Sequence, residues 1–426
     1  MVLAIGALSV VPIQIVGDLF VGEVALVLVG GCLLLSRSAS RSLALPGVGS
    51  TLVAMLVMLA GYMLTDLVRG SLPEQYLRGW GRTALFVLEF VAMCLLALPR
   101  PSRFLWFSAG YGLGGIAILA LYHHVPIDHW KLFMVEGKFV PGYGDYVVVL
   151  FSALAGWLPG AVAAIGFGLL AVLSMAWDFR IHAAVCALTG MLLAWRGRAS
   201  SPSVGSAGRH EGRRRIRARA IWPLALLLVG LAVVLRVGLM LTADPSSIER
   251  RGQSNVGRQF GLEVGIRTVL HSPLLGYGSW GRSAEVSAIQ RDVLHDSADY
   301  AQVAGPDDGG LAVSVHSAIL QVWVEAGVLG AAALLLLGWR LLAWMRVALV
   351  DRPFDRLTPV LTYSWIYALW NLVNSGFLGR SRLAFAIVGA LVVMVMSERP
   401  RRHRRQRTVG SGPMARIAPP AGGVGR

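Results

Sequence analysis

The residues best suited to chemistry lie in and around one long polar segment, 242–315, which separates two late apolar runs. The segment is rich in arginine and glycine, and His316 follows it where the chain becomes apolar again. An imidazole titrates near neutral pH, so His316 could accept the proton of a hydroxyl group at the mouth of a helix. A structural histidine, which caps that helix or bonds a loop carbonyl, is an equally open interpretation.

Arginine is the second residue type in the pattern, and its planar guanidinium binds phosphate oxygens in a bidentate manner. We therefore predict a site for a pyrophosphate or a similarly anionic head group. Arg180 is favoured because it lies in a very short turn beside apolar runs, where translocating a cation is costly. For the arginines of the long segment, solvated loop charges or interfacial side chains are an alternative. The arginines assigned to this site are Arg180, Arg258, Arg251, Arg267, Arg82 and Arg380.

The long segment contains some local order. Its pattern predicts an amphipathic helix over 255–270, which the following Ser-Pro pair ends. On such a helix Arg251 and Arg258 share a face if it begins early enough, whereas Arg267 points nearly the opposite way. The glycine-rich stretch 274–281 could bring backbone N–H groups to an anion or a sugar, or it could be only a compact loop.

Hydrophobic residues make up 55% of the 426 residues and charged residues only 15%, a balance that predicts an integral membrane protein. The apolar runs lack the alternation of a β-barrel, so they are expected to cross the bilayer as helices. The predicted fold class is all-α, a polytopic membrane protein with about 12 transmembrane helices and one large extracytoplasmic loop. The predicted spans are 2–16, 18–35, 48–65, 83–98, 104–121, 145–158, 160–177, 182–195, 220–241, 311–340, 357–373 and 381–396.

The net charge of +16 lies mostly in short segments between or after the apolar runs, which argues against nucleic acid as a partner. Arginines are dense in 196–219 and again after residue 398, so both segments are predicted to be cytoplasmic. Alternation then places both termini in the cytoplasm and the long loop outside the cytoplasmic membrane. The predicted division is an N-terminal transmembrane bundle (1–195), a basic linker (196–219), a C-terminal transmembrane region with the loop 242–315 (220–397), and a basic, disordered tail (398–426).

No cofactor and no metal site is predicted. Cys32, Cys94 and Cys186 fall inside apolar runs without paired spacing, as small core hydrophobes do. Asp292 and His295 belong to a loosely spaced acidic group that is better explained as a solvated face than as a set of metal ligands. Phosphate-loop, dinucleotide-binding and metalloprotease motifs are absent from the sequence.

Three stretches resemble the O-antigen ligase and polysaccharide polymerase superfamily of bacterial envelope glycosyltransferases. Gly257-Arg258-Gln259-Phe260, followed by Arg267 and then Pro273-Leu274-Leu275-Gly276-Tyr277-Gly278, is similar to the family's arginine-led loop element ending in P-L-L-G-x-G. His316-Ser317 and Glu325-Ala326-Gly327-Val328-Leu329-Gly330 are similar to its H-N-x-x-L…E-x-G-x-x-G segment, with Ser317 in place of asparagine. Arg180 is placed like the arginine of the family's S-R-G turn, although the turn here is Asp178-Phe179-Arg180-Ile181.

The resemblance implies an enzyme that moves a glycan from an isoprenoid (undecaprenyl-type) pyrophosphate carrier to an acceptor hydroxyl on the outer face of the membrane. It implies inversion at the anomeric carbon, without a metal, in cell-surface polysaccharide assembly. Outward arginines, Arg258 and Arg180 foremost, would stabilise the departing pyrophosphate, and His316 would remove the acceptor's proton. The implied partners are the lipid-linked glycan donor, membrane lipids, and a glycan, lipid or protein acceptor.

The main alternative is a transporter or flippase of lipid-linked glycans, in which an arginine-lined cavity would bind the same pyrophosphate. The sequence favours the enzyme because it shows no matching halves and gathers its polar features on one face instead of at the midplane. A membrane scaffold with an outer binding loop is a second alternative, but it needs no histidine beside an arginine cluster. A ligase and a polymerase differ in the acceptor, so the sequence leaves that choice open.

Overall fold

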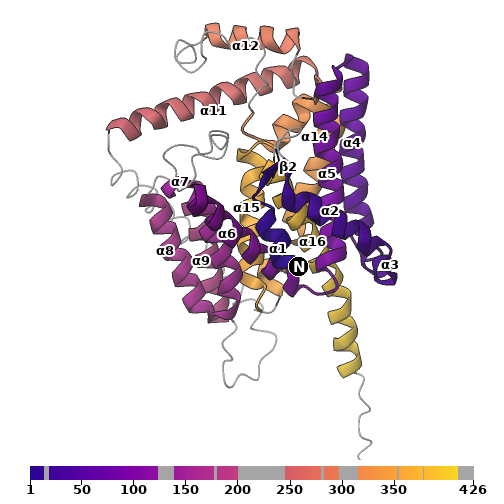
Figure 1. Ribbon diagram of the computed structural model, residues 1–426, viewed down its shortest axis with the longest axis vertical. Coiled ribbons are helices and arrows are strands. Elements are labelled where there is room, and N and C mark those ends of the chain that lie inside the picture. Colours follow the sequence, from indigo (N-terminus) through magenta and orange to yellow (C-terminus); the bar gives the residue numbers. More distant parts are fainter. Residues whose placement is uncertain are drawn as a thin grey trace, which may run out of the picture.

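The computed structural model describes residues 1–13, 19–122, 139–176, 180–199, 245–279, 283–296, 315–352, 355–377 and 379–410. Apart from one short pair of strands, its elements are helices, gathered into an elongated bundle with two helices across one end (Figure 1). A helix satisfies its backbone groups within one segment, which lipid requires because it offers no hydrogen-bond partners. The predicted all-α class is therefore confirmed.

The main core of the bundle is built by helices from both halves of the chain. Their facing sides bury large side chains, among them Met58 and Phe90, which are fully inaccessible. Gly61 allows α4 and α14 to approach closely, since a Cβ there would lie 3.0 Å from the backbone nitrogen of Gly330. The helices of this group are α2 (Val21–Leu34), α3 (Arg37–Leu43), α4 (Val48–Arg69), α5 (Pro73–Ala97), α14 (Ala318–Arg346) and α16 (Gly379–Gly410).

A second group of helices packs beside the first, and α15 joins the two groups. Its core contains Phe167, Val185 and Tyr363, with Phe151 and Phe167 in edge-to-face contact at 5.1 Å between ring centroids. The elements of this group are α6 (Ser102–Tyr122), α7 (Phe139–Leu154), η2 (Ala155–Trp157), α8 (Gly160–Ala176), α9 (Arg180–Ala199) and α15 (Thr358–Asn374).

A tight turn joins α4 to α5 and fixes where both helices end. Gly70, at φ 64°, closes α4 in the left-handed region, and the Ser71 N–H donates to the Asp66 carbonyl (3.0 Å). Pro73 begins α5 at a first-turn position, where its missing N–H is not needed. The turn thereby places Asp66 and Arg69 at the end of α4, next to the polar loop described below.

Ion pairs show which helix ends lie together. Just after η4 (Val347–Asp351), Arg352 pairs with Glu398 of α16 (3.1 Å) and with Asp355 (2.8 Å). Its carbonyl also accepts a bond from Arg196, near the end of α9. The first residues of α9, α14 and α16 consequently lie at the opposite end of the bundle. We call the two ends the Arg352 end and the loop end.

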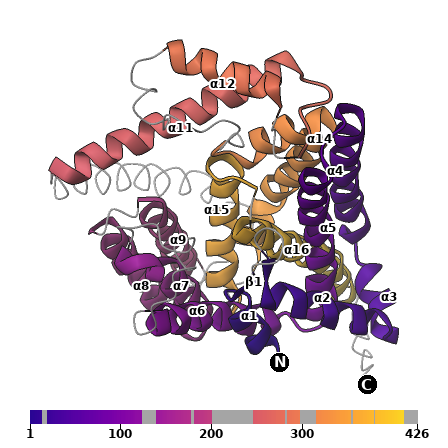
Figure 2. The ribbon, with the colours of Figure 1, turned by 45° about the horizontal axis from the view of Figure 1, so that its top comes forward.

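Two helices lie across the loop end of the bundle (Figures 1 and 2). They are α11 (Pro245–His271) and α12 (Ala284–Asp296), and with the intervening loop 272–279 we call them the cap. A small hydrophobic cluster that includes Val264, Val286 and Val293 holds the cap together. The predicted helix 255–270 is confirmed and ends before the Ser-Pro pair as expected, but it begins earlier, at Pro245.

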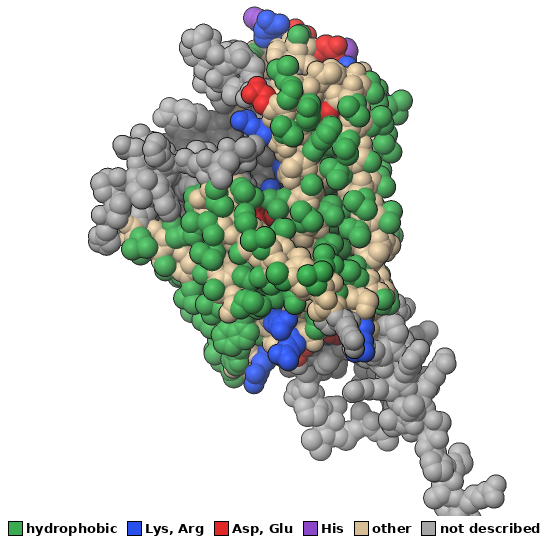
Figure 3. All heavy atoms as spheres, turned by 45° about the vertical axis from the view of Figure 1, so that its right-hand side comes forward, with side chains coloured by type: hydrophobic (Ala, Val, Ile, Leu, Met, Phe, Trp, Pro, Cys, Tyr) green, Lys and Arg blue, Asp and Glu red, His purple; other side chains and the backbone are tan. Residues whose placement is uncertain are grey.

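The side of the bundle in Figure 3 is covered mainly by hydrophobic side chains, with Lys and Arg gathered at its lower edge. Exposed apolar residues include Val53 (59%) and Leu67 (72%) on α4, and Ile165 (64%) and Leu169 (61%) on α8. An apolar surface of this extent is expected to face lipid. Within the described residues, 5 helices are long and apolar enough to cross a membrane, which agrees with a multi-pass membrane protein.

The set of spans differs from the predicted one. The predicted span 2–16 is wrong, because α1 (Val2–Leu8) has only 7 residues and is followed by the strand pair β1 (Pro12–Ile13) and β2 (Leu19–Phe20). A helix of that length rises about 10 Å, well short of the roughly 30 Å hydrocarbon core. The predicted span 220–241 lies outside the described residues.

Two basic segments complete the comparison with the predicted division. The linker 196–219 is described only as far as 199, where it continues α9. The tail 398–426, predicted to be disordered, begins as helix, because α16 continues to Gly410. Arginine and glutamine favour helix over coil, which explains the extension beyond the apolar part of α16.

Cysteine accessibility tests the assignment of the two ends. In a variant whose native cysteines are replaced, Gln259→Cys on α11 should react with a membrane-impermeant maleimide in intact cells. Asp351→Cys, at the Arg352 end, should react only after permeabilisation, because the bilayer separates the two positions. Equal labelling of both positions in intact cells would contradict the arrangement.

Candidate functional site

Helix α14 is broken near its start, and the polar loop of the cap attaches at the break. Gly327 has φ 63° and ψ −160°, which interrupts the helical hydrogen bonds and is accessible almost only to glycine. The carbonyl of Val324 accepts a bond from the Tyr277 N–H (2.7 Å). The carbonyl of Glu325 accepts one from the Gly278 N–H (3.1 Å). The loop therefore replaces part of the hydrogen bonding that α14 gives up.

The contact between the loop and α14 is close enough to require glycine on both sides. A Cβ on Gly276 would lie 2.7 Å from the backbone nitrogen of Gly327. A Cβ on Gly327 would lie 2.2 Å from the Leu274 carbonyl oxygen. Gly276 also has φ 68°, in the left-handed region. The two glycine-containing motifs of the sequence thus pack directly against each other.

The end of α4 holds the loop from the other side. The Asp66 carboxylate accepts bonds from the Ser279 N–H (2.7 Å) and from the Ser279 hydroxyl (2.6 Å). Arg69 donates to the Gly276 carbonyl (3.0 Å), and its guanidinium lies 4.6 Å from the centroid of the Tyr277 ring. The cap is therefore fixed to two helices of the main core at once.

Tyr277 is held as a neutral phenol within these contacts. Partial burial raises the pKa of Tyr277, the nearby Glu285 carboxylate raises it further, and the Arg69 guanidinium opposes the shift. Its hydroxyl lies 2.8 Å from Nδ1 of His271. The phenol is consequently protonated at neutral pH and links the end of α11 to the loop.

These bonds use the backbone N–H groups in the described middle of the glycine-rich stretch. The N–H groups of residues 276–279 are all used within the protein: Gly276 donates to the Ser272 carbonyl (3.2 Å), and the others donate to α14 and Asp66 as described. A cradle for an anion or a sugar would need those groups free. The N–H groups of residues 276–279 are therefore not available to such a ligand, while residues 280 and 281 of the stretch lie outside the described residues.

A buried charge cluster adjoins the break in α14. Arg82 of α5 forms an ion pair with Glu325 of α14, and their side chains are only 8% and 6% exposed. The hydroxyl of Tyr62 on α4 donates to the same carboxylate (2.6 Å). Gln321 donates to its other oxygen (3.2 Å) and accepts the Phe377 N–H (2.7 Å). Arg82, predicted to bind pyrophosphate, thus already has a carboxylate partner.

Arg267, assigned to the same predicted site, is also paired. It bonds Glu263 on its own helix (2.5 Å) and Asp296 at the end of α12 (2.7 Å). The hydrogen bonds to Asp296 and Glu263 raise the pKa of Arg267. In this arrangement Arg267 fastens α12 to α11.

Arg258 and His316 are exposed at the loop end. Arg258 lies on α11, while His316 precedes α14. Ser317 is the N-cap of α14, since its hydroxyl accepts the Leu320 N–H (3.4 Å). Ser317 and not His316 therefore caps α14, and the imidazole lies just outside the helix. The alternative that His316 bonds a loop carbonyl stays open.

Arg180 is the first residue of α9 and is half-buried at the loop end. The three residues predicted to be catalytic thus come from three separate segments and share one end of the molecule. Arg251 and Arg380 belong to α11 and α16, but their side chains lie outside the part that the structure describes.

The sequence interpretation missed the residues that hold this end together. Asp66, Tyr62 and the pair of His182 with Asp145 were not predicted, and no partner was assigned to Glu325. Their common signal is an ionisable or hydroxyl group within a long apolar helix. Such a group must find a partner inside the protein, but the sequence does not say which helix supplies it.

Comparison with known proteins agrees with the motifs. The family model described as O-antigen ligase matches residues 146–335, a stretch that includes Arg180, Arg258 and His316. The match confirms the resemblance to the O-antigen ligase and polysaccharide polymerase superfamily. No curated protein matches the chain.

The buried ion pair should matter far more to stability than the exposed one beside the loop. Glu325→Gln leaves the Arg82 charge buried without its counter-charge, at an expected cost of about 3–5 kcal/mol. Glu285→Gln removes the 56% exposed partner of Arg69 and should cost less than about 1 kcal/mol. Denaturant unfolding in detergent compares the two variants. Similar losses in both would contradict the assigned importance of the buried cluster.

The contact between the loop and α14 predicts that alanine substitutions at two glycines change the stability in opposite directions. Gly276→Ala forces a Cβ against the backbone of Gly327 and should lower the unfolding free energy by at least about 1–3 kcal/mol. Gly81→Ala, in helix α5 with nothing within 4 Å of its Cβ, should stabilise the helix by about 0.5–1 kcal/mol. Thermal unfolding measures both, and an unchanged Gly276→Ala protein would be inconsistent with the packing.

Proposed function

We propose that this protein transfers a glycan from an isoprenoid pyrophosphate carrier to an acceptor hydroxyl on the outer face of the cytoplasmic membrane. The transfer is metal-independent and inverts the anomeric carbon. The proposal is supported by the positions of Arg180, Arg258 and His316, which lie at the same end of the bundle and within the stretch that matches the O-antigen ligase family.

Charge availability favours Arg258 over Arg82 and Arg267 as a donor-binding residue, and Arg180 is assigned to the same site from its place at the start of α9. Arg258 is exposed, and no residue in the described ranges forms an ion pair with it, whereas Arg82 and Arg267 face carboxylates. A guanidinium can bridge phosphate oxygens and stabilise the charge that develops on the departing pyrophosphate. Arg251 and Arg380 would add to this site from the neighbouring parts of α11 and α16.

His316 is assigned the role of general base. The acceptor oxygen forms a bond to the anomeric carbon while the bond from that carbon to the pyrophosphate oxygen breaks. The hydroxyl proton passes to the imidazole, and the electron pair of the broken bond leaves with the pyrophosphate. A single displacement of this kind inverts the anomeric configuration.

The boundary between bundle and cap suits both substrates. The isoprenoid chain can stay in lipid beside the apolar surface of the bundle, while the glycan and the acceptor remain in water. The acceptor is a glycan in the polymerase case and a lipid-linked core or a protein in the ligase case.

The proposal is tested by transfer in proteoliposomes that contain an isoprenoid-pyrophosphate glycan, candidate acceptors and EDTA. Loss of the general base in His316→Ala should lower the transfer rate at least about 100-fold. Arg258→Ala should lower it by about 100- to 1000-fold through loss of leaving-group stabilisation. Both variants should still be folded.

Matched controls lie on α12. His295→Ala and Arg291→Ala remove the same residue types from exposed positions of the cap and should transfer at the wild-type rate. Wild-type activity in His316→Ala would contradict the assigned base. Protein-dependent movement of the labelled lipid across the bilayer, without product for any acceptor, would favour a flippase instead.

A further inference from the structure

Between the two groups of helices lies a cavity that the proposed mechanism does not use, and we call it the polar cavity after the ionisable and hydroxyl groups in its wall. It lies between α6, α7 and α9 on one side and α15 and α16 on the other, with a volume of about 90 Å³. A bound water needs roughly 10–15 Å³ of such space, so the cavity has room for several water-sized groups. Its polar lining includes Ser108, Asp145, His182, Tyr363 and Ser364.

An imidazole–carboxylate pair forms one wall of this cavity. Nε2 of His182 on α9 contacts the carboxylate of Asp145 on α7. The His182 side chain is 4% exposed, whereas that of Asp145 is 32% exposed, which places the carboxylate nearer the mouth. His182 follows Arg180 closely in α9, so the pair lies just inside the loop end.

Tyrosine rings form a further part of the wall. Tyr363 and Tyr367 of α15 stack with 5.7 Å between centroids and 12° between planes, and the Tyr367 ring lies 5.5 Å from that of His182. Tyr363 is 3% exposed, and no group in the described ranges hydrogen-bonds its hydroxyl. A buried hydroxyl without a partner is costly, and a ligand in the cavity would supply one.

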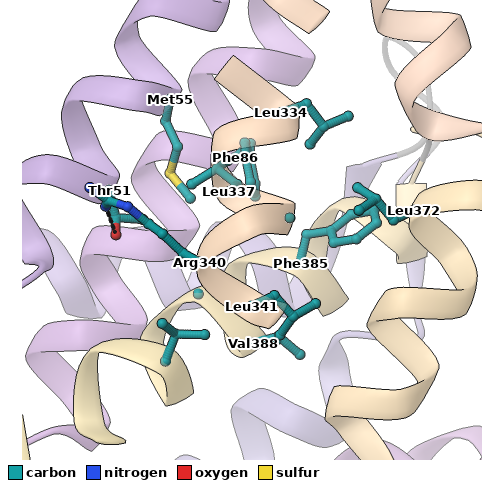
Figure 4. A pocket seen from close by; sticks show the side chains of 13 residues that line it. Thr51, Met55, Phe86, Leu334, Leu337, Arg340, Leu341, Leu372, Phe385 and Val388 are labelled. Atoms are coloured by element: carbon teal, nitrogen blue, oxygen red, sulfur yellow. Dashed lines mark hydrogen bonds between the residues drawn. The ribbon is translucent and has the colours of Figure 1, made fainter. Parts of the chain in front are cut away.

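A second cavity has a lining with fewer polar side chains. That cavity, of about 40 Å³, lies between α4, α14 and α16 and is lined almost wholly by apolar side chains (Figure 4). Its two polar side chains bond each other, since Arg340 donates to the Thr51 hydroxyl (2.8 Å).

We propose that the polar cavity binds the hydroxyl edge of a pyranose sugar. Carboxylate, imidazole and phenol groups match the donors and acceptors of sugar hydroxyls. Flat aromatic faces suit the apolar C–H face of the ring. The inference rests on the proposed function for the source of the sugar, which is either the first sugar of the donor glycan or the acceptor.

Sugar binding can be measured without transfer. Full-length protein in lipid nanodiscs, which avoid sugar-based detergents, is probed with methyl glucopyranoside, methyl galactopyranoside and methyl mannopyranoside by saturation-transfer NMR. Tyr363→Phe keeps the ring packing but removes the hydroxyl, and it should weaken binding about tenfold. His182→Asn should weaken it by a similar factor, and Thr51→Val, in the apolar cavity, should leave it unchanged.

Binding that is equal in wild type and both cavity variants overturns the inference, as does a wild-type protein that binds none of the three probes. Because this readout needs no donor lipid, it separates failure of the cavity inference from failure of the transferase proposal.

The source of the sugar is resolved by two further measurements. If the cavity holds the donor sugar, Tyr363→Phe weakens binding of the glycan-bearing isoprenoid pyrophosphate but not of the bare isoprenoid pyrophosphate. If it holds the acceptor, the same variant raises the KM for the acceptor and leaves donor binding unchanged. No change in either quantity contradicts the inference.

Discussion

The arrangement of the loop end depends on one exchange of hydrogen bonds, between the broken helix α14 and the glycine-rich loop. The left-handed conformation of Gly327 releases carbonyls that a helix would normally use, and the loop supplies the missing donors. A buried carbonyl without a hydrogen-bond partner costs several kcal/mol, so break and loop are stable only together. His316 precedes this helix and Arg258 lies on the helix that leads into this loop, so their relative position depends on the exchange.

Buried charge adds a second constraint on the same end. Glu325 lies next to the break and pairs with Arg82, while Arg382 of α16 pairs with Glu23 (2.6 Å) and Glu89 (3.2 Å). Neither group of charges is tolerable in an apolar core unless its partners come together from different helices. These pairs specify how the helices assemble.

The sequence predicted the helical class and the end of α11, because apolar runs and a Ser-Pro stop are local signals. The residues of the candidate site stay predictions. The sequence did not predict that α1 stops after Leu8, since an apolar run has the same composition whether it crosses the bilayer or turns back. From the sequence, Arg82 and Arg267 were also assigned to the pyrophosphate site. Their carboxylate partners lie on other helices or one helical turn away, and tertiary packing decides which arginine is neutralised.

The central claim is that the pyrophosphate binds at the loop end, between the cap and the start of α9. Photo-crosslinking with an isoprenoid pyrophosphate that carries a diazirine beside the phosphates, followed by peptide mass spectrometry, tests it most directly. The account predicts adducts in α11 near Arg258 and at the start of α9 near Arg180. Adducts confined to the Arg352 end, or to the middle of the bundle, would contradict it.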